Sequence, residues 1–327
     1  MKTKLKKEIE RPLIYFVDKE VKTVCLLPVT PTLVLYGCSD GSLYIDNLHS
    51  KGHLITLNHM KNSIVHTVIL KDPNTFNYFM IIIQDRMGVI SVVLLKVNER
   101  ELKAEYLSEF NTKVWTFTRM SVFYEKSFDE ALIAMPSLSS EIDVYSIKGV
   151  IKQTYVAKKN IESNIASALL FLGLHLINSY EDGTIVVWSV KENNMEATFK
   201  LLKEMGNIIT LEGITYPTYY QIYVGAYNQS ISILHYTPNT KLLQQIFLLT
   251  NVCCGEKPGI SDIKLREDLK LFFTAGYDYR VRCYSTRSNK LIAVLKYHSK
   301  TVNQICLLGN KVIACSDDGY ITEWEAY

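Results

Sequence analysis

The same turn-and-strand pattern occurs near the middle and at the end of the chain. Residues 181–188 read Glu-Asp-Gly-Thr-Ile-Val-Val-Trp, and residues 317–324 read Asp-Asp-Gly-Tyr-Ile-Thr-Glu-Trp. An Asp-Gly pair is typical of a tight turn between antiparallel strands, and the residues after it are rich in strand formers. A repeated turn and strand predicts a fold built from copies of one small antiparallel sheet.

Five further sites fit the same spacing, with a turn residue followed six positions later by a strand residue. The turn positions are 40, 87, 139, 182, 228, 278 and 318, and the gaps between them are 47, 52, 43, 46, 50 and 40 residues. WD40 repeats have a period of roughly 40–45 residues, with one four-stranded blade per repeat. The 327-residue chain is therefore predicted to be all-β, a single seven-bladed WD40 β-propeller over residues 1–327.

The last repeat predicts how the ring closes. Its third strand ends near Trp324 and the chain ends at Tyr327, so its fourth strand has to come from elsewhere. The apolar run Pro12–Val17 precedes the first strand of blade 1 and has no other place in the repeat pattern. We expect residues 11–17 to form the outer strand of blade 7, which closes the ring and protects its edges. Residues 1–10 are expected to form a basic tail.

Composition narrows the kinds of partner. The formal net charge is +3, too small a bias for the concentrated basic face of a nucleic-acid-binding protein, so no direct nucleic acid is expected. Apolar runs such as 168–174 are far shorter than a membrane span, so no membrane is expected. Seven cysteines without a Cys-x-x-Cys, and no apolar segment behind the first Met, predict a reduced intracellular compartment. The tail lysines are read as a nuclear import signal or as a solvated terminus: Lys2, Lys4, Lys6 and Lys7.

The sequence indicates no enzyme, no cofactor and no metal site. The common phosphate-binding, zinc-protease and hydrolase motifs do not occur. Adjacent Cys253 and Cys254 would form a strained bridge at best, so a loop packed against the propeller is weighed against a redox or metal role. Four histidines lie close in sequence, but the region reads as strand and turn, where helical ligand spacing fails: His49, His53, His59 and His66.

Residues of the repeat signature are read as structural. A His, a Ser or Thr, the turn Asp and the strand Trp form a buried hydrogen-bonded chain in a well-formed blade. Blade 7 offers His298, Asp318 and Trp324, but Ala314 occupies the Ser position, so this chain is expected to be incomplete. Blade 6 offers Thr274, Asp278 and Tyr284, and blade 4 offers Asp182 and Trp188. No nucleophile is placed beside His298 and Asp318, so they are not read as a catalytic pair.

The residue before each turn is expected on one face of the ring, around the channel. Tyrosine and arginine dominate binding hot spots, so this face is read either as a partner site or as ordinary packing between blades. The seven residues are Ser39, Arg86, Leu138, Glu181, Tyr227, Tyr277 and Asp317. Five of them are predicted to bind a partner: Arg86, Glu181, Tyr227, Tyr277 and Asp317.

Residues 165–327 also carry an ordered set of longer motifs. They are Tyr-Glu-Asp-Gly at 180–183, Pro-Gly-Ile at 258–260, Ala-Gly-Tyr-Asp-Tyr-Arg-Val-Arg at 275–282 and Leu-Ile-Ala-Val-Leu-Lys-Tyr-His-Ser at 291–299. In this set the chain resembles the family of guanine-nucleotide-binding protein subunit beta-like protein 1, whose fungal member is ASTRA-associated protein 1. One departure is Tyr277, where the family tends to have Trp.

The resemblance implies a non-enzymatic scaffold. It implies association with the Tel2–Tti1–Tti2 co-chaperone in the maturation of phosphatidylinositol-3-kinase-related kinases, and membership of the chromatin-linked ASTRA complex. It further implies a chain that is monomeric within a complex, in nucleus and cytoplasm. The alternative is a substrate receptor of a cullin-type ubiquitin ligase, although residues 188–191 lack the Asp and Arg of the Trp-Asp-x-Arg motif. A G-protein β subunit is not expected, because Pro12 interrupts the short stretch where its N-terminal helix would lie.

Overall fold

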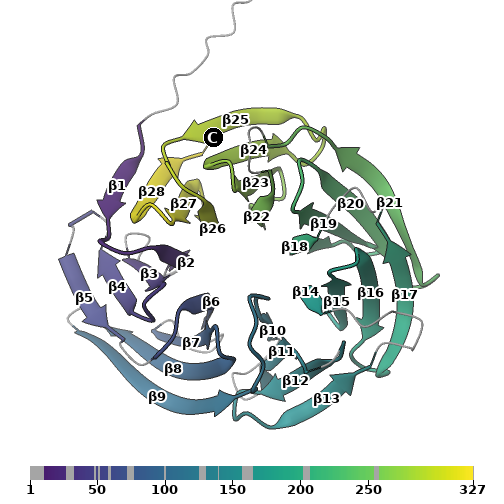
Figure 1. Ribbon diagram of the computed structural model, residues 1–327, viewed down its shortest axis with the longest axis horizontal. Coiled ribbons are helices and arrows are strands. Elements are labelled where there is room, and N and C mark those ends of the chain that lie inside the picture. The colour runs from purple at the N-terminus through teal and green to yellow at the C-terminus, as the bar shows by residue number, and fades with distance from the viewer. Residues whose placement is uncertain are drawn as a thin grey trace, which may run out of the picture.

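The computed structural model describes residues 11–26, 33–47, 49–50, 52–57, 60–71, 77–98, 101–124, 130–138, 140–156, 165–201, 207–253 and 258–326. These residues form seven four-stranded antiparallel sheets, arranged as blades around a central channel (Figure 1). The predicted all-β, seven-bladed propeller is confirmed. None of the described segments forms a helix that is long and apolar enough to cross a membrane. The predicted basic tail, His59 and Cys254 lie outside the described residues.

Each blade runs from a strand at the channel to a strand at the rim (Figure 1). For blades 1 to 7, the innermost strands are β2 (Val21–Leu26), β6 (Ile64–Lys71), β10 (Ser121–Phe123), β14 (Ala166–Leu172), β18 (Ile208–Thr215), β22 (Ile260–Leu265) and β26 (Val302–Leu308). The second strands are β3 (Leu33–Cys38), β7 (Tyr78–Asp85), β11 (Leu132–Pro136), β15 (His175–Tyr180), β19 (Tyr220–Ala226), β23 (Leu271–Gly276) and β27 (Lys311–Ser316).

The outer half of each blade completes the sheet. The third strands are β4 (Leu43–Asn47), β8 (Val89–Asn98), β12 (Ile142–Ser146), β16 (Thr184–Ser189), β20 (Ile231–Thr237), β24 (Arg280–Ser285) and β28 (Tyr320–Glu325). The outermost strands are β5 (Gly52–Thr56), β9 (Glu101–Asn111), β13 (Ile151–Tyr155), β17 (Asn194–Lys200), β21 (Leu242–Leu249), β25 (Leu291–Lys296) and, in blade 7, β1 (Leu13–Phe16).

The predicted turns all fall between the second and third strands of a blade. Gly183 and Gly319 have φ angles of 83° and 80° there, a region that glycine enters without steric cost. The turn of blade 3 lies between β11 and β12, and its predicted residue Ser139 is outside the described part of the chain.

The N-terminal strand closes the ring as predicted. Strand β1 pairs antiparallel with β28, with Leu13 opposite Glu323 and Phe16 opposite Tyr320. The backbone N–H of Val17 continues the ladder and donates to the carbonyl of Gly319 at 2.7 Å. Figure 1 shows this first strand lying beside the C-terminal sheet, so blade 7 is built from both ends of the described chain.

Buried apolar side chains hold neighbouring blades together. The described core divides into seven clusters, and each cluster joins residues of two adjacent blades. For example, Tyr180 and Trp188 of blade 4 pack with Val144 and Tyr155 of blade 3. Both faces of the middle strands are therefore buried, which explains their nearly continuous apolar sequence. The result is a continuous ring that holds the turns around the channel in fixed positions.

Candidate protein-docking face

Three of the predicted pre-turn residues lie at one mouth of the channel. Ser39, Arg86 and Tyr277 line one hollow of about 410 Å³. We call it the channel-mouth hollow; its other lining residues are Glu20, Lys22, Ser63, Ile64, Val65, Phe117, Arg119, Ile209, Ser261 and Asn303. Leu138 and Glu181 are exposed on their turns and are not among the residues that line the hollow. The structure thus brings part of the predicted set together.

Arg86 is the most distinctive of these residues. Its guanidinium lies over the ring of Phe117, with the central carbon 4.1 Å from the ring centroid, and 4.8 Å from the ring of Trp115. Its Nε is buried and has no hydrogen-bond partner among the described residues. Stacking on aromatic rings favours the cation, but it leaves this donor unsatisfied.

Trp115 and Phe117 form an aromatic platform that the sequence analysis missed. Their side chains are 65% and 70% exposed, whereas Val114, Thr116 and Thr118 between and beside them are buried. The alternation is that of an extended strand, but with the aromatic side chains facing solvent and the threonines facing inward. In the sequence, Trp115 and Phe117 alternate with Val114, Thr116 and Thr118. This alternation is the signal that could have identified the platform.

Hydrogen bonds fix this inverted orientation. The Thr118 hydroxyl donates to the Ala166 carbonyl at 2.7 Å, and the Thr112 hydroxyl donates to the Gly88 carbonyl at 3.0 Å. The Thr116 N–H donates to the Arg86 carbonyl at 3.2 Å. The platform segment is therefore attached to blades 2 and 4. These bonds hold its aromatic rings in one outward orientation.

Tyr227 and Tyr277 form a second aromatic pair on this face. Their ring centroids are 5.5 Å apart at an interplanar angle of 66°, an edge-to-face contact. Gly259 lies beneath them with φ of 140°, and a Cβ there would come within 2.7 Å of the Tyr277 ring. Burial raises the pKa of Tyr277. Tyr277 is thus largely packed, whereas Tyr227 is 53% exposed.

Asp317 lies beside the hollow and pairs with its lining residues. Its carboxylate forms an ion pair with Lys22 and accepts a 2.7 Å hydrogen bond from the Asn303 amide. Burial disfavours the charged form of Lys22, but hydrogen bonds and charges of Asp317 and Glu20 outweigh it and raise the lysine pKa. Asp317 is therefore engaged within the chain, unlike the Nε of Arg86.

Charged side chains continue into the channel below the hollow. Arg119 pairs with Asp262 at 2.9 Å, and Lys264 pairs with Glu212 at 2.9 Å, around a cavity of about 150 Å³. His66 lines the same cavity, and burial together with the charges of Arg119 and Lys264 lowers its pKa well below the usual range. Each of the two cations is paired with an anion, so the charges of this network are neutralised within the channel.

His53 and Cys253, two of the residues weighed as metal ligands, form hydrogen bonds rather than a metal site. Across the described ranges, no group of three or more His, Cys, Asp or Glu side chains is arranged to hold a metal ion. His53 bonds to Asp46 at 2.7 Å, and the Cys253 thiol donates to the Gly259 carbonyl at 3.3 Å.

The signature chain of blade 7 is complete, contrary to the expectation from Ala314. His298 Nδ1 lies 3.1 Å from Asp318, and its Nε2 lies 3.0 Å from the Thr322 hydroxyl. The indole N–H of Trp324 donates to the same hydroxyl at 3.2 Å. Thr322 stands directly opposite Ala314 on the paired strand, so it supplies the hydroxyl from across the sheet.

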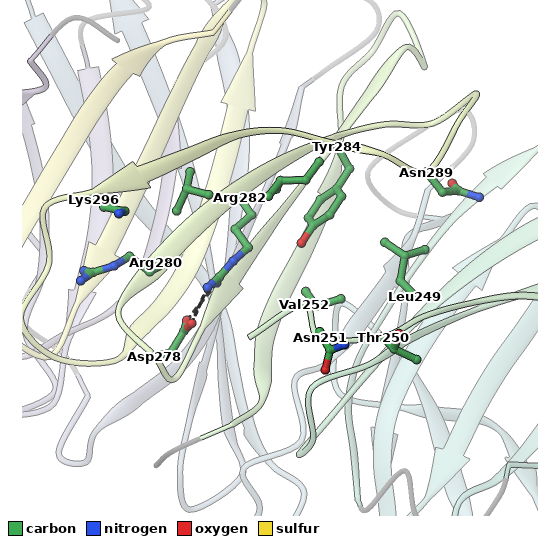
Figure 2. A pocket seen from close by; sticks show the side chains of 12 residues that line it. Leu249, Thr250, Asn251, Val252, Asp278, Arg280, Arg282, Tyr284, Asn289 and Lys296 are labelled. Atoms are coloured by element: carbon green, nitrogen blue, oxygen red, sulfur yellow. Dashed lines mark hydrogen bonds and ion pairs between the residues drawn. The ribbon is translucent and has the colours of Figure 1, made fainter. Parts of the chain in front are cut away.

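Blade 6 uses a different partner from the one expected. Asp278 forms a bidentate ion pair with Arg282, at 3.0 and 2.5 Å (Figure 2). Arg282 stands opposite Thr274 in the sheet, and the Thr274 hydroxyl is buried without a hydrogen-bond partner in the described part of the structure. The expected chain through Thr274 is therefore replaced by a charged pair.

In blade 4 the two signature residues, Trp188 and Asp182, bond to different partners. The indole N–H of Trp188 donates to Asn178, four residues before the turn Asp, at 2.6 Å. Asp182 instead accepts from the N–H and hydroxyl of Thr184, both at 2.8 Å, and pairs with Lys200. In all three blades the signature residues bond within the fold, which is a structural use.

Known proteins with similar sequences carry two names. A protein of Mus musculus named guanine nucleotide-binding protein subunit beta-like protein 1 is 27% identical over 159 residues, 46% of this chain and 44% of its own length. A Schizosaccharomyces pombe protein named ASTRA-associated protein 1 is 38% identical over 102 residues, 29% of this chain and 26% of its own length. The chain spans less than half the length of these relatives. Their names confirm the resemblance drawn from the motifs.

Solved structures extend the fold comparison over nearly the whole chain. Raptor of Chaetomium thermophilum superposes with a TM-score of 0.75 at 10% identity, over 98% of this chain and 29% of that one. The computationally designed protein Ika8 gives a TM-score of 0.66 at 12% identity, over 97% and 100% of the two chains. These similarities concern the fold alone. No protein-family profile matches the chain.

Proposed function

We propose that this relative of guanine nucleotide-binding protein subunit beta-like protein 1 and ASTRA-associated protein 1 is a non-enzymatic scaffold. In this proposal a protein partner docks on the face that holds the channel-mouth hollow and the aromatic platform. The propeller fold and the names of the relatives support the general role. The residues of this face support the location.

The observation that carries the proposal is the stack of Arg86 on Phe117 beside Trp115. Tryptophan and arginine are enriched in the few residues that dominate binding energy at protein interfaces. Exposure of such rings to water is unfavourable, and a second protein surface that covers them would remove this cost. Because hydrogen bonds of Thr112 and Thr118 hold the segment, little conformational entropy would be lost when a partner binds.

The chemistry of the face favours a protein as the occupant. Ile165 and Leu138 are 59% and 82% exposed and extend the apolar area on the same face. Lys22 and Arg119 in the hollow are already paired with Asp317 and Asp262. A mixed apolar and partly neutralised surface matches a protein interface better than the uniformly basic face that nucleic acid requires.

For the partner we propose the Tel2–Tti1–Tti2 co-chaperone, in the maturation of phosphatidylinositol-3-kinase-related kinases. The motifs of residues 165–327 and the name ASTRA-associated protein 1, carried by relatives, support this choice. On this proposal the chain works as a monomer within the ASTRA complex, in nucleus and cytoplasm.

Affinity purification of the tagged chain from its native cells, followed by mass spectrometry, tests the proposal. We expect the three co-chaperone proteins among the specific partners. Recovery of a cullin adaptor in their place would favour a ubiquitin-ligase receptor and would contradict the proposal. Recovery of neither, from cells in which the co-chaperone is abundant, would also contradict it.

A further inference from the structure

A second hollow lies away from the channel, on the side of the ring between blades 5 and 6. Its volume is about 560 Å³. We call it the blade 5–6 groove. Its lining residues are Leu249, Thr250, Asn251 and Val252 of blade 5, and Asp278, Arg280, Arg282, Tyr284, Asn289, Leu291, Val294 and Lys296 of blade 6 (Figure 2).

Three cross-strand pairs of β24 and β25 form one wall of the groove. In the observed register Arg280 faces Lys296, Arg282 faces Val294 and Tyr284 faces Leu291. Directly opposite residues of an antiparallel pair project from the same side of the sheet, so all six side chains point toward blade 5. Leu249 to Val252, at the end of β21 and after it, form the facing side of the groove. Tyr284 packs in the apolar cluster between blades 5 and 6, whereas Leu291 and Lys296 are exposed.

The pair of Arg280 and Lys296 is unfavourable within the chain. Like charges directly opposite each other on paired strands destabilise a sheet. Arg280 makes only long hydrogen bonds, to the carbonyls of Tyr279 and His298 at 3.3 and 3.4 Å, and no ion pair of either cation is seen among the described residues. Arg282 is already neutralised by Asp278. The free positive charge of the groove is therefore concentrated at one end, where Figure 2 shows Arg280 and Lys296.

The opposite end of the groove holds an unsatisfied acceptor. The side-chain oxygen of Asn289 is buried and has no hydrogen-bond partner in the described structure. A buried acceptor without a donor is unfavourable, and a donor from a bound molecule would remove this cost. A peptide backbone supplies such a donor at every residue except proline.

Apolar side chains lie between these two polar ends and continue onto the rim. Leu249, Val252 and Val294 line the groove. The outermost strands on both sides expose further apolar residues, between 37% and 51% of each side chain: Ile246, Phe247, Leu248, Leu291 and Ile292. An outer strand with exposed apolar residues is usually covered by something, because it otherwise invites aggregation.

We propose that the blade 5–6 groove binds an extended, acidic and apolar segment of a protein partner. Its carboxylates would pair with Arg280 and Lys296, its apolar side chains would pack on Leu249, Leu291 and Val294, and a backbone N–H would donate to Asn289. Charge complementarity selects an acidic segment, and an extended segment can reach both polar ends of the groove. The scaffold then has a second docking site, separate from the channel-mouth face.

Selection from a displayed library of short random peptides tests this proposal on the isolated chain. The selected peptides are expected to combine acidic with apolar residues and to bind the purified protein in a fluorescence polarisation assay. The double variant Arg280→Glu/Lys296→Glu is expected to bind them at least about tenfold more weakly, since it replaces two attractive charges by two repulsive ones.

A matched control separates the groove from net charge. Lys152→Glu/Lys191→Glu changes the charge equally at exposed positions of blades 3 and 4, and it is expected to bind the peptides as the wild type does. A thermal melt of each variant checks that it is folded.

Three outcomes would overturn the proposal. They are a selected consensus without acidic residues, peptide binding that the groove variant leaves unchanged, and binding of a single-stranded DNA oligonucleotide in preference to every acidic peptide. Because the assay needs no co-chaperone, its result does not depend on the function proposed for the channel-mouth face.

Discussion

Tyr15, on the strand that closes the ring, donates a 2.6 Å hydrogen bond to Asp46 in blade 1. The carboxylate is almost fully buried, and it also accepts from the Tyr36 hydroxyl at 2.5 Å and contacts His53 at 2.7 Å. Burial, and then the hydrogen bond to Asp46, raise the pKa of Tyr15 to about 12, so the phenol keeps the proton that this bond requires. The closing strand is thus attached to blade 1 as well as to its own sheet.

Tyr15→Phe is expected to lower the free energy of unfolding by roughly 1.5 kcal/mol, because it removes one donor to a buried carboxylate. Urea denaturation of the purified chain measures the change. Tyr320→Phe is the control, since Tyr320 lies opposite Phe16 in the same strand pair and its hydroxyl has no hydrogen-bond partner among the described residues. Equal midpoints for the two variants would show that the Tyr15 bond does not hold the closure.

Thr322→Val tests the signature chain of blade 7. The substitution keeps the shape but leaves the Trp324 N–H and His298 Nε2 without their shared hydroxyl, which costs roughly 2–3 kcal/mol. The loss should appear as a lower denaturation midpoint. Thr218→Val, at an exposed turn position, is expected to have little effect. A Thr322 variant as stable as this control would mean that the chain of hydrogen bonds contributes nothing.

The pH dependence of stability is expected to reflect Asp318. Burial opposes its ionisation, but hydrogen bonds from His298 and the Ser299 N–H outweigh burial and lower its pKa to about 2. An unfolded Asp has a pKa of about 3.9. The stabilisation is therefore fully present above about pH 4 and is lost as the pH falls toward 2.

The comparison between the wild type and Asp318→Asn isolates this contribution. We expect the difference in unfolding free energy to be largest near neutral pH and to shrink between about pH 4 and pH 2. Denaturation at a series of pH values measures it. If the difference in unfolding free energy between the two proteins stayed constant down to pH 2, Asp318 would not be the source of the pH dependence.

Removal of only one partner of the Asp278–Arg282 ion pair is expected to lower the free energy of unfolding strongly. Arg282→Met leaves a buried carboxylate unpaired and should destabilise the chain by roughly 3–5 kcal/mol. The double variant Asp278→Asn/Arg282→Met should recover part of that loss, because it removes the stranded charge. Arg280→Met, two residues away on the same strand, is the control. If Arg282→Met were no worse than this control, the pair would not contribute to stability.

Most of the fold could be predicted from the sequence because each blade repeats a local pattern. The turns at Asp182 and Asp318 combine Asp-Gly with an alternating strand, so local backbone chemistry specifies them. The place of Pro12–Val17 followed from counting strands, since one sheet was short of its fourth.

The signature networks were less predictable because their partners lie across the sheet. Counting along one strand finds Ala314 and Thr274, whereas the bonds are made by their cross-strand neighbours Thr322 and Arg282. The strand register that creates these neighbours is a property of the folded sheet. The aromatic platform was missed for a related reason: Trp115 faces outward because Thr118 bonds to Ala166, 48 residues further along the chain.

The most direct test of the docking proposal uses the double variant Trp115→Ala/Phe117→Ala as bait in an affinity purification. The amount of the Tel2–Tti1–Tti2 proteins captured is compared with that captured by the wild type. Both rings are mostly exposed, so the melting temperature should match that of the wild type. Tyr106→Ala/Leu107→Ala, which truncates two exposed side chains on β9 of blade 2, is the matched control. We predict that the platform variant captures about tenfold less of the co-chaperone than the wild type, while the control captures it fully. Full capture by a folded platform variant would contradict the account.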